Sequence, residues 1–121
     1  MIRGGFVTLF VSDRDRAVRF YVETLGMKLV EEESHWAVID AGDGLRLGLA
    51  VKGPDSVAVK RDALLASVSF YPKVPFDEAI AILENRGVHF DVKEIGPMTF
   101  AHFRDPDGNA LALCTRHVER P

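Results

Sequence analysis

The chain has 121 residues, which is enough for one domain of modest size or two very small ones. Its formal net charge is −3 and its pI is about 5.8, so it lacks the clustered positive charge that binding to nucleic-acid phosphates requires. The single cysteine, Cys114, excludes an internal disulfide and a zinc site built on cysteine pairs. No apolar run approaches the roughly 20 residues of a membrane helix. Because the N-terminus also lacks the apolar block of a secretory signal, we expect a cytoplasmic protein without membrane or nucleic-acid partners.

The first half of the chain predicts a strand, a helix and three further strands. Residues 6–11 alternate with a period of two, which is typical of a strand. Ser12 or Asp13 caps the predicted helix, and Gly26 suits its left-handed C-terminus. Asp43-Gly44 predicts a hairpin turn between the last two strands. The three later strands are predicted at residues 28–32, 36–40 and 45–51.

The second half repeats this order of elements. Its strand, helix and three further strands are predicted at residues 66–71, 77–87, 88–93, 100–104 and 110–115. The last hairpin turns at residues 105–108, in register with residues 41–44 of the first half. The repeat indicates two βαβββ modules, at residues 5–52 and 64–116. A polar connector at residues 53–63 joins them, and a short tail follows at residues 117–121.

Neither module alone has enough strands to bury a sheet face. Together the modules predict a single α+β domain with one curved, roughly eight-stranded mixed sheet, helices on its outside and a cup on its inside. Side-by-side and domain-swapped arrangements of the modules both fit the repeat. Strand alternation directs the leucines of residues 45–51 and 110–115 under the helices, and Arg46, Gly48, Ala50, Ala110, Ala112 and Cys114 into the cup.

Two segments carry a resemblance to a known family. VTLFVSDRDRAVRFYVETLGMKLVEE (residues 7–32) and FRDPDGNALAL (residues 103–113) together resemble the vicinal oxygen chelate superfamily. This superfamily contains glyoxalase I, extradiol dioxygenases, fosfomycin-modifying enzymes and bleomycin-resistance proteins. The resemblance implies paired βαβββ modules, a ligand-binding cup and a homodimer whose cups include residues from both subunits.

The resemblance also implies four metal-ligand positions, on the first and last strands of each module. They fall on Phe6, Gly48 and Ala112, and on either Ser67 or Val68, of which strand alternation favours Ser67. None of these side chains suits a hard divalent ion, which needs carboxylate or imidazole ligands. We therefore expect no metal and no other cofactor, and the metal-dependent activities of the superfamily are not expected.

With these positions apolar or small, the cup suits an organic ligand. The predicted ligand-binding residues are aromatic, small or polar, namely Phe6, Thr8, Phe10, Trp36, Arg46, Gly48, Ser67, Phe100, His102 and Ala112. Aromatic rings can stack on a planar ligand, and Arg46 can pair with a carboxylate, a phosphate or an aromatic face. These residues also have plainer interpretations. Phe6 and Phe10 can simply fill the cup, and Trp36 can lie at its rim or at a dimer interface. Arg46 can be solvated or form a salt bridge.

Three functions are compatible with these residues. The first is metal-independent binding or sequestration of an aromatic or amphipathic compound, as in antibiotic resistance of the bleomycin type. The second is an enzyme, such as a lyase, an isomerase or a dioxygenase-like protein, with His102 as a general base or Arg46 stabilising an anionic intermediate. For His102, a hydrogen-bonded structural role is the plainer interpretation. The third is a non-catalytic partner subunit or regulator.

Overall fold

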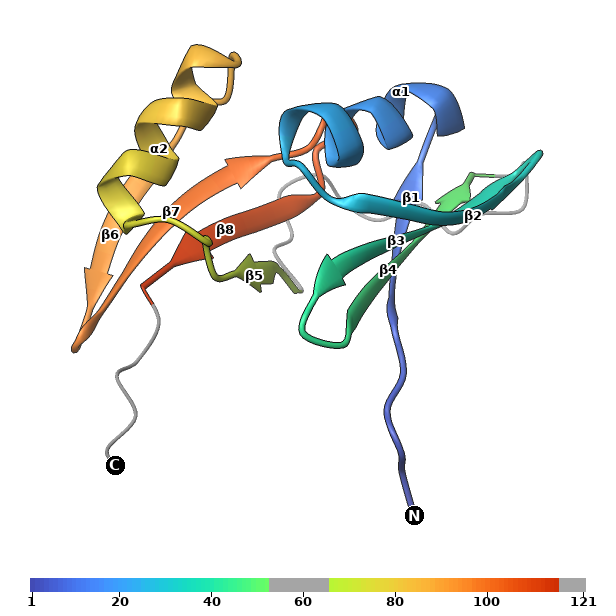
Figure 1. Cartoon of the computed structure of the whole chain (residues 1–121), viewed down its shortest axis with the longest axis horizontal. Coiled ribbons are helices and arrows are strands. Elements are labelled where there is room, and N and C mark those ends of the chain that lie inside the picture. Colours follow the sequence, from blue (N-terminus) through green and yellow to red (C-terminus); the bar gives the residue numbers. More distant parts are fainter. Residues whose placement is uncertain (53–65, 116–121) are drawn as a thin grey trace. The chain divides into compact units, whose positions relative to one another are not determined.

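The computed structural model describes residues 1–52 and 66–115 (Figure 1). The predicted connector at residues 53–63 and the predicted tail at residues 117–121 lie outside these ranges. The chain divides into two units, residues 1–61 and residues 62–121, and each unit has its own sheet. Within the described ranges, no helix is both long and apolar enough to cross a bilayer.

The first unit is a four-stranded mixed sheet in the order β1-β4-β3-β2. β1 runs parallel to β4, and the other neighbouring strands are antiparallel. Its elements in chain order are β1 (Val7–Val11), α1 (Arg14–Arg19), the π-helical η1 (Phe20–Thr24), β2 (Lys28–Glu33), β3 (Trp36–Gly42) and β4 (Leu45–Val51).

Local capping sets both ends of the helical stretch that α1 and η1 form. Asp13 is the N-cap, and its side chain accepts a hydrogen bond from the Arg16 amide at 3.1 Å, as predicted. Gly26 has a left-handed backbone with φ +79°, which turns the chain out of the helix. The predicted start and end of this helix are therefore confirmed.

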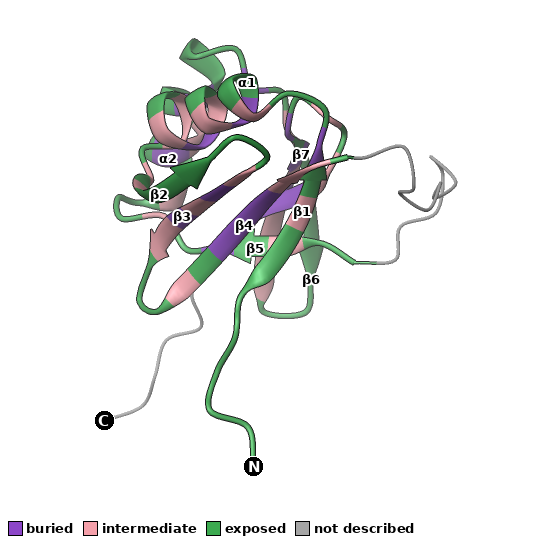
Figure 2. Ribbon diagram, turned by 90° about the vertical axis from the view of Figure 1, so that its right-hand side faces the viewer, coloured by how far each residue is buried: buried purple, intermediate pink, exposed green. Residues whose placement is uncertain are grey.

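The core of the first unit lies between this helical stretch and the sheet. α1 packs on β3 and β4, and Figure 2 shows that buried residues concentrate on these two central strands, whereas β2 at the edge is exposed. The fully buried side chains are Val11, Ala17, Tyr21, Ala37, Ile39, Leu47 and Leu49. The alternate residues of each strand lie on the opposite side of the sheet, which we call the open face of the unit.

The second unit repeats the topology of the first. Its sheet order is β5-β8-β7-β6, with β5 parallel to β8 and the other neighbours antiparallel. This repetition confirms the α+β class and the two βαβββ modules. Hydrogen bonding divides the eight strands of the described residues into two sheets of four. The elements are β5 (Val68–Phe70), α2 (Phe76–Asn85), β6 (Asp91–Ile95), β7 (Met98–Arg104) and β8 (Ala110–Cys114).

The strand predicted at residues 88–93 is wrong in its bounds, because β6 begins only at Asp91. Val88 is buried, and its amide bonds to the Leu83 carbonyl at the end of α2 (3.0 Å). The Phe90 ring contacts the Phe103 ring edge-on, with the centroids 5.2 Å apart. These apolar residues therefore fill the core beside the helix end instead of extending the strand. The strand predicted at residues 66–71 is likewise shorter, at Val68–Phe70.

The turn between β7 and β8 is built around the buried carboxylate of Asp105. Its Oδ1 accepts hydrogen bonds from the backbone amides of Asp107 (2.9 Å) and Asn109 (2.8 Å). Its Oδ2 accepts a third from the Asn109 side-chain amide at 2.8 Å. One side chain thus holds the loop in the conformation that brings β8 back alongside β7.

We expect Asp105→Ala to lower the free energy of unfolding by about 2–4 kcal/mol, because it leaves three donors without their acceptor. Urea unfolding followed by circular dichroism measures this change. Asp91→Ala serves as the control, since its exposed ion pair with Lys93 (3.6 Å) contributes little to stability. Equal stability of the two variants would show that the turn does not depend on Asp105.

Candidate ligand-binding site

Strand register determines which side chains share the open face of the first unit. Thr8 pairs with Gly48 and Gly48 with Val38, so these three form one row across the sheet. Phe10, Ala50 and Trp36 form the next row towards the β2–β3 hairpin. In the opposite direction along the strands, the next open-face positions are Arg46 and its partner Asp40. Phe6, just before β1, lies at the same end of the face. The predicted ligand-binding residues of this unit are thus brought together on one face.

The side chain of Trp36 lies across the sheet, over Gly48. A Cβ atom built on Gly48 would overlap with Cη2 of the Trp36 ring and lie 2.8 and 2.9 Å from Cζ2 and Cζ3. Only glycine therefore leaves room for the ring. The ring also meets Phe6 edge to face, with centroids 5.8 Å apart and an interplanar angle of 75°. Trp36 thus contacts Gly48 on β4 and Phe6, which lies just before β1.

Aromatic surface remains accessible on this open face. Phe6 is 59% exposed and Phe10 is 53% exposed, whereas Trp36 is half-buried. Arg46 is also exposed, and its side chain forms no hydrogen bond or ion pair within the described ranges. Strand alternation predicts that these residues share a face, and the register places them on one, but the contact between Trp36 and Gly48 was not predicted.

The open face of the second unit carries different side chains from the open face of the first. Ser69, Ala112 and His102 form one row, and Cys114 and Phe100 form the next. Ser69 pairs with Ala112 as Thr8 pairs with Gly48. Ser67 precedes Ser69 by two residues and so corresponds to Phe6, whereas Val68 pairs with Leu111, a core residue. Of the two alternatives, the register thus selects Ser67, which lies just before β5 and is exposed.

His102 packs against an aromatic ring. Its imidazole stacks on Phe100, with centroids 6.0 Å apart and an interplanar angle of 17°. Asp91 is its register partner on β6, but the Asp91 carboxylate pairs with Lys93 at 3.6 Å. Within residues 1–52 and 66–115, the imidazole forms no hydrogen bond. The stacking differs from the hydrogen-bonded structural role expected from the sequence, and none of the described side chains orients His102 as a general base would require.

Comparison with known proteins assigns the family. The profile of the Glyoxalase/Bleomycin resistance protein/Dioxygenase superfamily matches residues 4–113. The chain belongs to this superfamily. No curated protein matches the chain.

Solved structures of similar proteins support the fold of this superfamily member. A glyoxalase/bleomycin resistance protein from Streptomyces sp. CB03234 is 27% identical, with a TM-score of 0.70 over 92% of this chain and 98% of the other. A glyoxalase family protein from Bacillus anthracis is 17% identical, with a TM-score of 0.77 over 97% of each chain. An integron cassette protein from Vibrio cholerae is 22% identical, with a TM-score of 0.71 over 97% of each chain.

The residues at the superfamily's metal-ligand positions do not fit a metal ion. In the first unit, Phe6 has no donor atom, and the Trp36 ring occupies the space that a side chain at Gly48 would need. In the second unit, Ala112 has no donor and Ser67 offers only a hydroxyl. Across the described part of the chain, no group of three or more His, Cys, Asp or Glu side chains could hold a metal ion. The metal chemistry of the superfamily therefore cannot be assigned to these residues.

Cys114 lies on the open face of the second unit and is buried. Its thiol lies 3.8 Å from the Phe70 carbonyl, to which it donates a weak hydrogen bond. Burial raises the pKa of the Cys114 thiol above its ordinary value. The thiol therefore stays protonated near neutral pH and is not a nucleophile.

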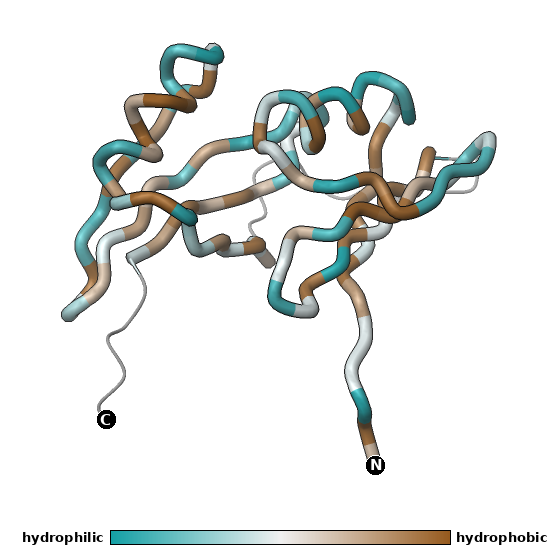
Figure 3. Tube along the Cα trace, in the orientation of Figure 1, coloured by the Kyte–Doolittle hydropathy of each residue, from teal (hydrophilic) through white to brown (hydrophobic). Residues whose placement is uncertain are grey.

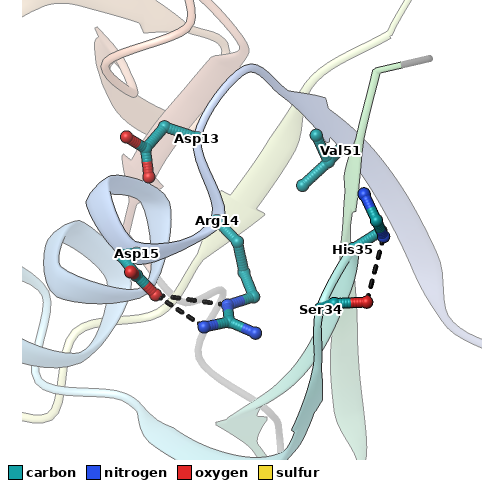
Figure 4. Close-up of a pocket in the computed structure, with 6 residues that line it drawn as sticks. All are labelled: Asp13, Arg14, Asp15, Ser34, His35 and Val51. Carbon is teal, nitrogen blue, oxygen red and sulfur yellow. Dashed lines mark hydrogen bonds and ion pairs between the residues drawn. The ribbon is translucent and has the colours of Figure 1, made fainter.

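A shallow hollow of about 270 Å³ lies at the start of α1, outside the open face (Figure 4). Arg14 donates hydrogen bonds to the Asp15 carboxylate (2.8 and 3.2 Å) and to the Glu33 carbonyl, so it ties the helix start to β2. The bond to Arg14 lowers the pKa of the Asp15 carboxyl. These polar groups bind each other, which favours a structural role. The hollow is lined by Asp13, Arg14, Asp15, Ser34, His35 and Val51.

We expect Gly48→Ala to displace the Trp36 ring, because the new methyl group cannot share its space. The chain should remain folded but lose about 1–3 kcal/mol of stability, which is the usual effect of overpacking. Trp36 is the single tryptophan, so a changed fluorescence emission maximum reports its new environment directly. Thr8→Val, a nearly isosteric change directly across from Gly48 on β1, should leave the emission unchanged. An unaltered spectrum for Gly48→Ala would mean that the ring does not lie on Gly48.

Proposed function

We propose that this superfamily member binds a small aromatic or amphipathic compound without a metal, and that the open face of the first unit supplies the stacking surface. The observation that carries the proposal is the Trp36 ring, which lies over Gly48 and meets Phe6 edge to face. Aromatic rings thus lie at two positions where the resemblance implies metal ligands.

The energetics of aromatic contacts support this proposal. A well-placed aromatic pair contributes about 0.5–1.5 kcal/mol beyond the burial of its area. Phe6, Phe10 and Trp36 offer several such contacts on one face, and their neighbour Ala50 carries only a methyl group. Small-molecule sites are usually lined by apolar and aromatic side chains with a few polar groups, and this face has that composition.

Sequestration is the role we propose for this binding. It requires affinity alone, so it is compatible with an open face that lacks a metal-ligand set and an oriented general base. Phe100, His102, Ser67 and Ala112 of the second unit are proposed as a further ligand-contacting set. A bleomycin-resistance type of protection against a toxic compound is the corresponding biological function.

The test is a thermal-shift screen of metabolites and antibiotics, with metal analysis on the same sample. A bound compound raises the unfolding midpoint, because it stabilises only the folded state. We expect Trp36→Ala to weaken binding of the hit about tenfold or more and Trp36→Phe to retain part of the affinity, in line with the loss of a stacking anchor. Ile95→Ala, which truncates an exposed apolar residue on β6, is the matched control.

Two results would contradict this function. One is a stoichiometric divalent ion in the purified protein that is lost, together with an activity, on chelation. The other is an affinity for the hit that Trp36→Ala does not change.

A further inference from the structure

A bulge in β2 determines which charges lie beside the aromatic rings. Leu29 pairs with Ile39 and Glu31 pairs with Val38, so Val30 is the extra residue between them. Without this bulge, Val30 would lie on the open face and Glu31 would point towards the helix. With it, Glu31 and the next alternate residue, Glu33, share the open face with Val38 and Trp36.

Independent contacts support this assignment of faces. Glu32 lies between the two open-face glutamates and pairs with the buried Ala37. Its Oε2 lies 3.9 Å from Nε of Arg14, at the start of α1, so Glu32 points to the helix side of the sheet. Figure 3 shows the hydrophilic end of β2 at the tip of the β2–β3 hairpin.

Glu31 and Glu33 carry charge that the described residues do not neutralise. Both side chains are exposed, and neither forms a hydrogen bond or ion pair within residues 1–52 and 66–115. Glu33 pairs in register with Trp36, which places the β-carbons of such partners about 4.5–5.5 Å apart. Carboxylates therefore border the aromatic surface on its β2 side.

Two cationic side chains of this face lie in a different row. Arg46 and Lys28 both neighbour Asp40 in register, one from each side. This alternation of charges lets Asp40 offset part of their positive charge. In the rows that contain Val38 and Trp36, the charged side chains are the carboxylates of Glu31 and Glu33, so the charge on the β2 side of the tryptophan is negative.

We infer that the compound bound at this face is an organic cation, such as a quaternary or aromatic ammonium, held against Trp36 and Phe6 with Glu31 and Glu33 beside it. The inference rests on the proposed function and adds the charge of the ligand to it. Ring faces carry negative electrostatic potential and attract cations, most strongly at tryptophan. The net charge of −3 for the whole chain attracts the same class of ligand from a distance.

Three probes with a common benzyl group test the inference: benzyltrimethylammonium, benzyl alcohol and phenylmethanesulfonate. Fluorescence of the single residue Trp36 measures each affinity. We expect the cation to bind about tenfold more tightly than the neutral probe, in line with a partly exposed cation–π site. The anion should bind most weakly, and added salt should weaken only the binding of the cation.

Matched glutamate variants locate the charge effect. The double variant Glu31→Gln/Glu33→Gln should weaken binding of the cation about three- to tenfold without changing that of benzyl alcohol, since only charge is removed. Glu32→Gln removes one negative charge from the other face of the strand and should leave both affinities unchanged.

The outcomes separate the inference from the function on which it rests. Equal or tighter binding of benzyl alcohol would overturn the cation inference and leave stacking intact. Preference for the sulfonate, abolished by Arg46→Gln, would assign an anionic ligand and also overturn it. Binding of none of the probes, together with no hit in the thermal-shift screen, would contradict the proposed function itself.

Discussion

Gly48 has no Cβ atom, and the arrangement of the whole open face of the first unit depends on that absence. The Trp36 ring occupies the space that any larger residue would take, and in that position it meets Phe6 edge to face. The resemblance to metal enzymes of the superfamily implies a metal ligand at this backbone position. One missing side chain thus exchanges a coordinating group for an aromatic surface, and the binding proposed for the protein follows from this exchange.

The two units show the effect of this position within one chain. Their sheets have the same strand order and directions. In register, Ala112 corresponds to Gly48 and Phe100 to Trp36. Ala112 carries a Cβ atom, and Phe100 stacks on His102 of its own strand instead of crossing the sheet. The duplicated fold therefore presents two differently filled faces, of which the first has the larger aromatic surface.

Much of the fold could be predicted because its determinants are local in the chain. The Asp13 cap, Gly26 and the period-two pattern of β4 each act over a few residues, and the structure confirms them. Prediction was wrong at β6, where apolar residues near Val88 belong to the core beside α2 and not to a strand. Apolar pattern alone does not distinguish these two positions.

The sequence could predict which side chains share the face, but not the contacts between them. Alternation placed the correct side chains on one face, but the contact of Trp36 with Gly48 depends on the register between β3 and β4. The bulge at Val30 likewise has no clear signal in the sequence, although it decides which glutamates lie beside the rings. Both features arise from strand pairing, which a single sequence does not reveal.

The most direct test of this account is a nuclear Overhauser spectrum of the protein with its single tryptophan assigned. The account predicts cross-peaks from the six-membered ring of Trp36 to the α-protons of Gly48, and upfield shifts of those protons caused by the ring current. Cross-peaks from the same ring to Phe6 should accompany them. A Trp36 ring with no cross-peak to Gly48, and Gly48 protons at ordinary shifts, would contradict the replacement of the metal ligand by an aromatic surface.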